Sequence, residues 1–256
     1  MAGVKVVAHR GASSVCPENT MAAFRRAIDL GADGIEFDVQ ATIDGGLVVV
    51  HDLSLERTTN GHGSVFAATL EEVRSLDAGA WFGNEHAGEK VPTLSEVLTL
   101  GDVEFELELK GYGEHFVDSV LDAVRNADVL KRVEFTGSNV ALLLLLKRRE
   151  PAATIGMFST PQPAWMSDEV FEHHIVGVAD TSGADVVHVH AACITARIVD
   201  RLHELSKIVH ANDALDAHDL RRALASGADR LSTNDVALAI DIVRSEHHPA
   251  RPGHRR

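Results

Sequence analysis

Two short segments carry acidic residues at every second position, and these carboxylates are the best candidates for metal ligands or catalytic groups. Glu36 and Asp38 alternate with apolar side chains between residues 34 and 40. Residues 103–110 repeat the pattern with Glu104, Glu106, Glu108 and Lys110. Because side chains on a β-strand point alternately to its two faces, each segment predicts a strand with one apolar and one charged face.

Carboxylates gathered inside a sheet are costly unless they are paired or bound to a cation. Converging oxygen ligands of this kind suit Mg²⁺ or Ca²⁺. The competing interpretation is a solvated strand face with salt bridges, which would explain either segment alone. Two such segments, together with the sequence His9-Arg10-Gly11, favour the cation site.

Two histidines stand where predicted strands end. His9 directly follows the strand predicted at Val4–Ala8, and His51, followed by Asp52, ends an extended run. Histidine titrates near neutral pH and can therefore give or take a proton. A lone histidine is usually a structural residue. The helical His-Asp metal motif does not fit here, because the valines before His51 predict a strand.

A repeated Gly-Ala-Asp sequence indicates how these residues are positioned. It occurs at residues 31–33, 183–185 and 227–229, each time after a helical pattern and before a strand-like run. Glycine just past a helix end adopts the left-handed conformation at low cost and turns the chain. Repeated helix-to-strand junctions predict a parallel sheet with crossover helices.

Eight strands are predicted, at Val4–Ala8, Gly34–Gln40, Val103–Lys110, Arg132–Thr136, Thr154–Phe158, Asp185–His190, Lys207–Ala211 and Asp229–Ser232. Helical patterns separate most of them, at Ala22–Leu30, His115–Ala127, Val140–Arg149, Ala196–Leu205 and Ala217–Ala225. The weakest stretch is 161–181, where residues 165–170 predict a short helix. This rhythm predicts an α/β fold, a TIM (β/α)8 barrel, with an open doubly wound sheet as the alternative.

Residues 47–93 interrupt the rhythm and predict an insertion after the second strand, lying over the barrel mouth. The insertion includes a short helix at Leu70–Ser75, with Thr69 as cap and Glu72 three residues on. We expect residues 1–246 to form a single domain. Residues 247–256, rich in His, Pro and Arg, predict a disordered tail.

Composition limits the class of protein. The chain has 256 residues, 45% of them hydrophobic, and a net charge of −14, which repels nucleic acid and anionic membranes. The longest apolar run, Val140–Leu146, is too short to span a membrane, and the early strand leaves no room for a secretion signal. Cys16 and Cys193 are far apart and suggest no disulfide framework, which favours a cytoplasmic location.

In chain order these sequences resemble the motifs of glycerophosphodiester phosphodiesterases. The matching segments are Val7–Gly11, Pro17–Thr20, Gly34–Val39, His51–Asp52, Arg57–Gly61, Pro92–Leu94 and Glu108–Lys110. After about residue 110 the resemblance is looser and rests on Asn212–Asp213 and Gly227–Asp229.

The resemblance implies a metal-dependent TIM-barrel enzyme that hydrolyses glycerophosphodiesters to glycerol 3-phosphate and an alcohol. It implies metal ligands at Glu36, Asp38 and Glu108, an acid/base pair at His9 and His51, and phosphate contacts at Arg10 and Lys110. Arginine grips phosphate through a planar fork, and lysine adds a point charge. Glu18 and Asn19 either orient these groups or serve the structure. The partner is a small-molecule phosphodiester. The alcohol, the choice between Mg²⁺ and Ca²⁺, and the oligomeric state stay open.

The resemblance also implies a reaction through a cyclic phosphate. The matching motifs hold no Ser, Cys or Thr beside a histidine as an obvious nucleophile, whereas the substrate carries a hydroxyl next to its ester carbon. Direct attack by a metal-activated water is the alternative route.

The last third departs from the family pattern. The tryptophan usual two or three positions before Asn212 is absent. An aromatic wall for the alcohol or glycerol part is therefore either missing or supplied elsewhere, with Trp81, Phe82 and Trp165 as candidates. A phospholipase D-like toxin, a metal amidohydrolase and a barrel that binds phosphodiesters without turnover are the alternatives. The His188-Val189-His190 pair is not on the first strand, where an amidohydrolase needs it, so we interpret it as a coincidence.

Overall fold

One closed sheet organises the protein. The computed structural model describes residues 3–247, and in this range nine strands form a sheet in the order β1-β9-β8-β7-β6-β5-β4-β2-β3. Strand β1 pairs in parallel with both β2 and β9, so eight parallel strands close into a barrel and the open doubly wound sheet is wrong. The strands are β1 (Lys5–Ala8), β2 (Gly34–Ala41), β3 (Leu47–Val49), β4 (Glu104–Leu109), β5 (Val133–Thr136), β6 (Thr154–Phe158), β7 (Val186–His190), β8 (Ile208–Asn212) and β9 (Arg230–Thr233).

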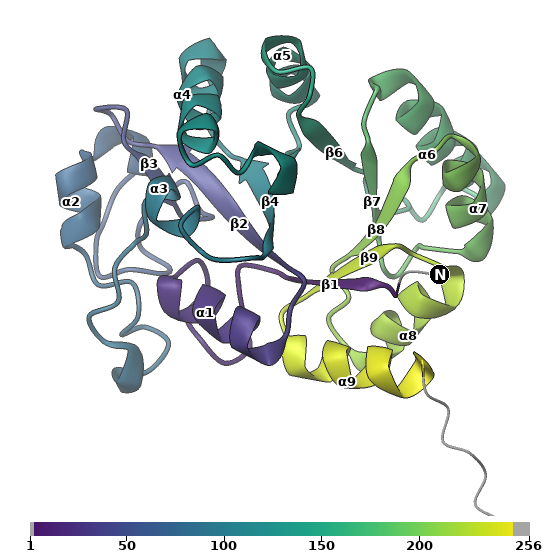
Figure 1. Cartoon of the computed structure of the whole chain (residues 1–256), viewed down its shortest axis with the longest axis horizontal. Helices are drawn as coiled ribbons and strands as arrows, with labels where there is room; N and C mark the ends of the chain where they lie inside the picture. Colours follow the sequence, from purple (N-terminus) through teal and green to yellow (C-terminus); the bar gives the residue numbers. More distant parts are fainter. Residues whose placement is uncertain (1–2, 248–256) are drawn as a thin grey trace, which may run out of the picture.

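Helices surround the barrel in the order of a (β/α)8 fold (Figure 1). They are α1 (Met21–Leu30), α2 (Leu70–Ser75), α3 (Leu94–Val97), α4 (Gly113–Asn126), α5 (Val140–Arg149), α6 (Asp168–Ser182), α7 (Ala196–Glu204), α8 (Ala217–Ser226) and α9 (Val236–His247). The eight predicted barrel strands and the five predicted helices are confirmed, with ends that differ by one or two residues.

The short helix predicted at residues 165–170 is wrong. The chain forms α6 instead, which spans 15 residues and begins at the cap Ser167, whose side chain accepts the N–H of Val170. Its apolar residues are diluted by His173, His174 and Gly177, which weakens the helical periodicity of the sequence. Packing decides here, since Phe171, Ile175 and Ala179 are buried against the barrel.

The Gly-Ala-Asp junctions behave as predicted. Gly31, Gly183 and Gly227 end α1, α6 and α8 in the left-handed conformation. Aromatic side chains then lock helix to sheet, because Phe24 of α1 packs edge-on against Phe37 of β2, which packs in the same way against Phe105 of β4. Apolar residues of the strands thus face the helices, and their polar residues face the barrel interior.

The insertion flanks the barrel beside β2 (Figure 1). Strand β3 pairs antiparallel with β2, and a small separate core forms from Val48, Val50, Leu55, Val65, Val73, Ala78 and Val91. The capping box predicted at Thr69 and Glu72 is confirmed. The insertion therefore anchors the extended run that carries His51 toward the barrel mouth.

Within residues 3–247 no helix is both long enough and apolar enough to cross a membrane. Cys16 and Cys193 both lie in this range and are free thiols. Of the tail predicted to be disordered, His247 ends α9 and residues 248–256 lie outside the described range.

Candidate active site

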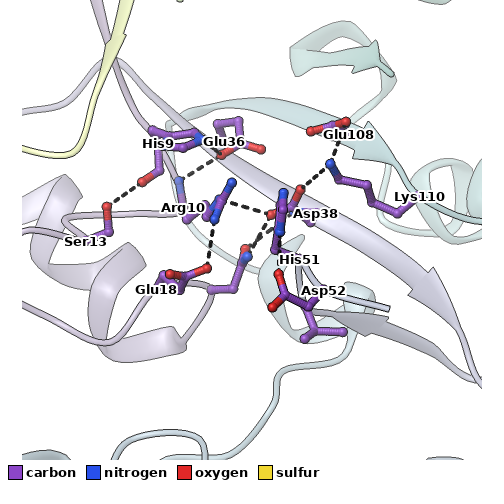
Figure 2. A network of polar contacts seen from close by, with 12 residues as sticks. His9, Arg10, Ser13, Glu18, Glu36, Asp38, His51, Asp52, Glu108 and Lys110 are labelled. Atoms are coloured by element: carbon purple, nitrogen blue, oxygen red, sulfur yellow. Dashed lines mark hydrogen bonds and ion pairs between the residues drawn. The ribbon is translucent and has the colours of Figure 1, made fainter. Parts of the chain in front are cut away.

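Three carboxylates meet where β2 and β4 end. Asp38 lies opposite Glu108 in the parallel register, and one oxygen from each of Glu36, Asp38 and Glu108 falls within 4.8 Å of the other two. Figure 2 shows Asp38 between Arg10 and Lys110, with Glu36 and Glu108 above it. Their convergence follows from the alternating pattern, since parallel strands in register carry equivalent side chains to the same place.

The electrostatics of this cluster suit a bound cation. Burial raises the pKa of Glu36 well above its usual range, and the neighbouring Asp38 and Glu108 raise it further. Burial and Asp38 also raise the pKa of Glu108. Asp38 Oδ1 is buried and accepts no hydrogen bond from the described residues. A hard divalent cation would relieve the repulsion among these carboxylates and bind that oxygen directly, so the donor set fits Mg²⁺ or Ca²⁺.

Two cationic side chains border the carboxylates. Arg10 Nε lies 3.5 Å from Asp38 Oδ2, and Lys110 Nζ lies 2.7 Å from Glu108 Oε1 and 3.3 Å from Asp38 Oδ1. Burial opposes their charge, but the surrounding carboxylates raise the pKa of both Arg10 and Lys110. Both side chains are therefore cationic at neutral pH, as a phosphate site requires.

The backbone around Arg10 is held in an unusual conformation. Arg10 has a φ of 57°, and its N–H donates to Glu36 Oε2 at 2.8 Å. Gly11 has a φ of 82°, and a Cβ there would lie 2.7 Å from the backbone carbon of Ala23 in α1. This close approach of loop and helix requires glycine.

Replacing Gly11 with Ala should therefore destabilise the protein by about 3 kcal/mol, the sum of a left-handed alanine and a backbone clash. For a chain of this size that corresponds to a fall in Tm of roughly 6–12 °C. Gly101→Ala is the control, because Gly101 has open space around its Cβ position and no positive φ. Equal Tm values for the two variants in thermal unfolding would contradict this assignment.

The two histidines have different partners. His9 Nδ1 donates to the amide oxygen of Asn234 at 2.8 Å, and its Nε2 lies 3.9 Å from Glu36. Burial, and then the charge of Arg10, lower the pKa of His9. His51 Nδ1 instead lies 2.7 Å from the Asp52 carboxylate. A neutral imidazole suits the environment of His9, whereas the ring of His51 is held by a carboxylate.

A chain of ion pairs fixes the orientation of His51. Arg57 donates to both oxygens of Asp52, at 2.7 and 3.0 Å, and to both oxygens of Glu18, at 2.7 and 2.8 Å. Glu18 in turn accepts a hydrogen bond from Arg10 at 2.9 Å. The Arg57 hydrogen bond lowers the pKa of Asp52, which keeps it ionised as the partner of His51.

Asn19 orients Asp38 in the carboxylate cluster, because its side-chain amide donates to Asp38 Oδ2 at 2.8 Å. Glu18 and Asn19 thus orient the site, which was one of the two roles that the sequence left open. The role of Asn234 and the ion pairs that Arg57 makes with Asp52 and Glu18 were not predicted, although Arg57 lies inside the matching segment Arg57–Gly61. Their partners lie far away in the chain, so spacing alone does not reveal them.

Two cavities flank the carboxylates. One, of about 250 Å³, is lined by His9, Arg10, Glu36, Glu106, Glu108, Phe158, Ser159, Pro161, His190, Asn212, Asp213 and Ser232. The other, of about 540 Å³, is lined by His51, Asp52, Leu53, Ser54, Leu109, Lys110, Gly111, Tyr112, Ser138 and Asn139. Each cavity contains one of the two histidines.

None of the three candidates for the aromatic wall is correct. Trp81, Phe82 and Trp165 line neither cavity, and the Trp81 indole instead packs against Phe82 and donates to the Ala78 carbonyl. Trp165 is 80% exposed in the loop before α6. Phe158 and Tyr112 provide the aromatic surface, one in each cavity. Phe158 is the last residue of β6, and Tyr112 follows the end of β4. Their position at strand ends was a signal that the sequence contained.

Comparisons with known proteins agree with this geometry. The sequence profile of the glycerophosphoryl diester phosphodiesterase family matches residues 9–238. A glycerophosphodiester phosphodiesterase of Caldanaerobacter subterraneus subsp. tengcongensis is 46% identical over 245 residues, which cover 93% of this chain and 97% of that protein.

Solved structures are similar over nearly the whole chain. The glycerophosphodiester phosphodiesterase of Agrobacterium tumefaciens is 27% identical with a TM-score of 0.80, covering 93% of this chain and 99% of its own. A phosphodiesterase of Oleispira antarctica, solved in complex with the product sn-glycerol-3-phosphate, is 26% identical with a TM-score of 0.80, covering 95% and 98% of the two chains.

Proposed function

Because this chain belongs to the glycerophosphoryl diester phosphodiesterase family, we propose that it hydrolyses glycerophosphodiesters to sn-glycerol 3-phosphate and an alcohol. The observation that carries the proposal is the cluster of Glu36, Asp38 and Glu108, bordered by two cations and two histidines between two cavities. The bound product of the Oleispira relative supports the same substrate class.

Glu36, Asp38 and Glu108 would hold a divalent cation, Mg²⁺ or Ca²⁺. When bound, the cation offsets negative charge on the phosphoryl oxygens and lowers the barrier to attack on phosphorus. Arg10 and Lys110 lie on either side of Asp38 and would bind the remaining phosphoryl oxygens. The phosphorus then lies between the two cavities.

The cavities differ in a way that assigns the two halves of the substrate. The cavity next to His9 is the smaller, and His190, Asn212 and Asp213 offer it several hydrogen-bonding groups. This suits the two free hydroxyls of a glycerol moiety. The cavity next to His51 is about twice as large and includes the exposed Leu53 and Tyr112. It suits a departing alcohol of variable size.

The partners of the histidines assign their roles. His9 pairs with a neutral amide, so its neutral form accepts the proton of the substrate hydroxyl. His51 is held by the Asp52 carboxylate beside the larger cavity, so we assign it the donation of a proton to the departing alcohol oxygen. A positioning role falls to Asn234 and Asp52, which hold the two Nδ1 atoms and leave the Nε2 atoms to react.

The substrate's own hydroxyl serves as nucleophile in this scheme. Its oxygen forms a bond to phosphorus as its proton passes to His9, the bond from phosphorus to the alcohol oxygen breaks, and the alcohol takes a proton from His51. The product of this step is a cyclic phosphate. Water then opens the ring, with the histidines in exchanged roles. A hydroxyl held about 3 Å from phosphorus has a high effective molarity, which favours this route over an external water.

A substrate whose adjacent hydroxyl is replaced by hydrogen or a methyl ether should be turned over at least ~10³-fold more slowly, because the internal nucleophile is lost. The measurement is alcohol release from glycerophosphodiesters that differ only at this position. A matched analogue modified at the terminal hydroxyl should retain most of its turnover. Similar rates for all three substrates would eliminate the cyclic route and favour direct attack by water.

The overall activity is tested by release of glycerol 3-phosphate from a panel of glycerophosphodiesters with Mg²⁺ or Ca²⁺ present. Tight binding without release would instead identify a barrel that binds phosphodiesters without turnover. The panel also identifies the alcohol preferred by the larger cavity. The cytoplasmic location stays a prediction from the sequence.

A further inference from the structure

A second polar cluster lies inside the barrel, one layer below the site. Glu106 of β4, Glu134 of β5, His188 of β7 and His210 of β8 are all buried, and one ligand atom from each falls within 4.8 Å of the others. Ordinary barrels fill such layers with branched apolar residues. Two acidic and two imidazole side chains at this depth are costly unless something satisfies them.

The four side chains leave several polar atoms unsatisfied. Glu134 is fully engaged, since Oε1 lies 2.7 Å from His188 Nε2 and Oε2 accepts from Arg230 at 2.7 Å. In contrast, His188 Nδ1, both ring nitrogens of His210 and Glu106 Oε2 are buried and have no hydrogen-bond partner among the described residues. Such atoms are rare in native proteins and need a physical explanation.

Two of the unsatisfied ring nitrogens face the Glu106 carboxylate. His188 Nδ1 lies 3.6 Å from Glu106 Oε1, and His210 Nδ1 lies 3.3 Å from Glu106 Oε2. Ligand atoms about 2.1 Å from a tetrahedral zinc ion are about 3.4 Å apart, so these spacings match those around an ion. Neither His188 Nδ1 nor His210 Nδ1 forms a hydrogen bond with any described residue.

Glu134 sets which nitrogen of His188 faces Glu106. Glu134 accepts from His188 Nε2–H, which leaves Nδ1 as the ring atom on the side of Glu106. A carboxylate on the far nitrogen is the usual support of a metal-binding histidine. Both ring nitrogens of His210 are buried without a hydrogen-bond partner among the described residues, and Nδ1 faces Glu106.

The chain also leaves space for this arrangement. A Cβ on Gly156 of β6 would lie 2.1 Å from Glu134 Oε1 and 2.8 Å from His188 Nε2. Any larger residue there would separate the two groups. Glu106 lines the cavity beside His9 as well as the small cavity of about 50 Å³ at the opposite end of the barrel, so it can be reached from both ends.

We propose that Glu106, His188 and His210 bind a second metal ion, a transition metal of the Zn²⁺ type, with Glu134 orienting His188. Its imidazole ligands separate this interior site from the all-carboxylate cluster above it, because Mg²⁺ and Ca²⁺ prefer oxygen alone. Enclosed by the barrel, the ion joins β4 to β7 and β8 and takes the structural place of an apolar layer.

The test uses the full chain, stripped of metal and then given Zn²⁺ in excess Mg²⁺, which occupies the carboxylate cluster. About one Zn²⁺ per chain should remain after dialysis, and X-ray absorption at the zinc edge should show imidazole scattering. His188→Gln and His210→Gln should each weaken Zn²⁺ binding by at least the ~10–100-fold that loss of an orienting residue costs. Glu134→Gln removes only the residue that orients His188, so it should weaken Zn²⁺ binding by ~10–100-fold.

His203→Gln is the matched control, since His203 also pairs with a carboxylate, Asp229, but lies outside the barrel. The His203→Gln variant should retain zinc, and its Tm should rise with zinc as the wild-type Tm does. The Tm of His210→Gln should not rise with zinc. Zinc with oxygen ligands only in the wild type would overturn the proposal even if the variants fail to fold. Undiminished zinc affinity in a folded His188→Gln or His210→Gln variant would overturn it too.

Discussion

Stripping the divalent cation from this enzyme should lower turnover by ~10³-fold or more, since a catalytic cation supplies several kcal/mol of charge stabilisation. Glu36, Asp38 and Glu108 are ordered for such an ion by the parallel register of β2 and β4. Without it, the three carboxylates repel one another, and their burial together with this repulsion raises the pKa values of Glu36 and Glu108. The phosphate then lacks the cation that would offset its charge, and only Arg10 and Lys110 remain to bind it.

The measurement is the turnover of a glycerophosphodiester by metal-stripped protein, before and after Mg²⁺ or Ca²⁺ is returned. Glu108→Gln should raise the Mg²⁺ concentration needed for half-maximal activity by ~10-fold or more. Glu71→Gln on α2, which changes an exposed glutamate in the same way, should leave it unchanged. Full activity of stripped protein in excess chelator would refute the carboxylate site. Recovery with Mg²⁺ or Ca²⁺ alone would separate its role from that of the interior zinc site.

The second large effect concerns the histidines. His9→Ala and His51→Ala should each lower turnover by ~10²–10⁴-fold, the usual contribution of a general acid or base. His62→Ala, in an exposed loop of the insertion, is the control and should retain wild-type activity. Thermal unfolding should give similar Tm values for all three, since neither active-site histidine is part of the apolar core.

A change of leaving group separates the two roles. The p-nitrophenyl ester of glycerol 3-phosphate releases a weakly basic alcohol that leaves without protonation. His51→Ala should therefore lose less than ~10-fold on this substrate, whereas His9→Ala should keep its full defect. The reverse pattern would exchange the acid and the base, and equal defects on both substrates would refute the division of labour.

Local pattern was enough for most of the fold. The family resemblance supplied the seven predicted site residues, and their roles stay predictions. Strand boundaries followed from alternating residues, and the junctions at Gly31, Gly183 and Gly227 followed from glycine geometry, because both signals act within a few residues. Glu36, Asp38 and Glu108 could be placed together since parallel strands end at one face. The extent of helix α6 could not be predicted from the sequence, because its few apolar residues are stabilised by packing against distant strands.

Long-range partners were decided only by the tertiary structure. Asn234 lies 225 residues from His9 and yet holds its ring, and the Arg57 bridge joins the loop after β1 to the insertion. The division into two cavities and the identity of Phe158 and Tyr112 as aromatic surfaces likewise depend on side chains from several strands.

The pair His188 and His190 shows most clearly what the sequence alone could not predict. The sequence alone made it a coincidence, whereas the fold places His190 in the smaller cavity and His188 beneath it in the barrel interior. By itself the sequence determined which residues face inward, because alternation along a strand is a local property. Only closure of the barrel decided which inward residues meet, because it brings β4 and β5 within reach of β7 and β8 across the interior, at a separation of about 50–100 residues that no spacing rule covers.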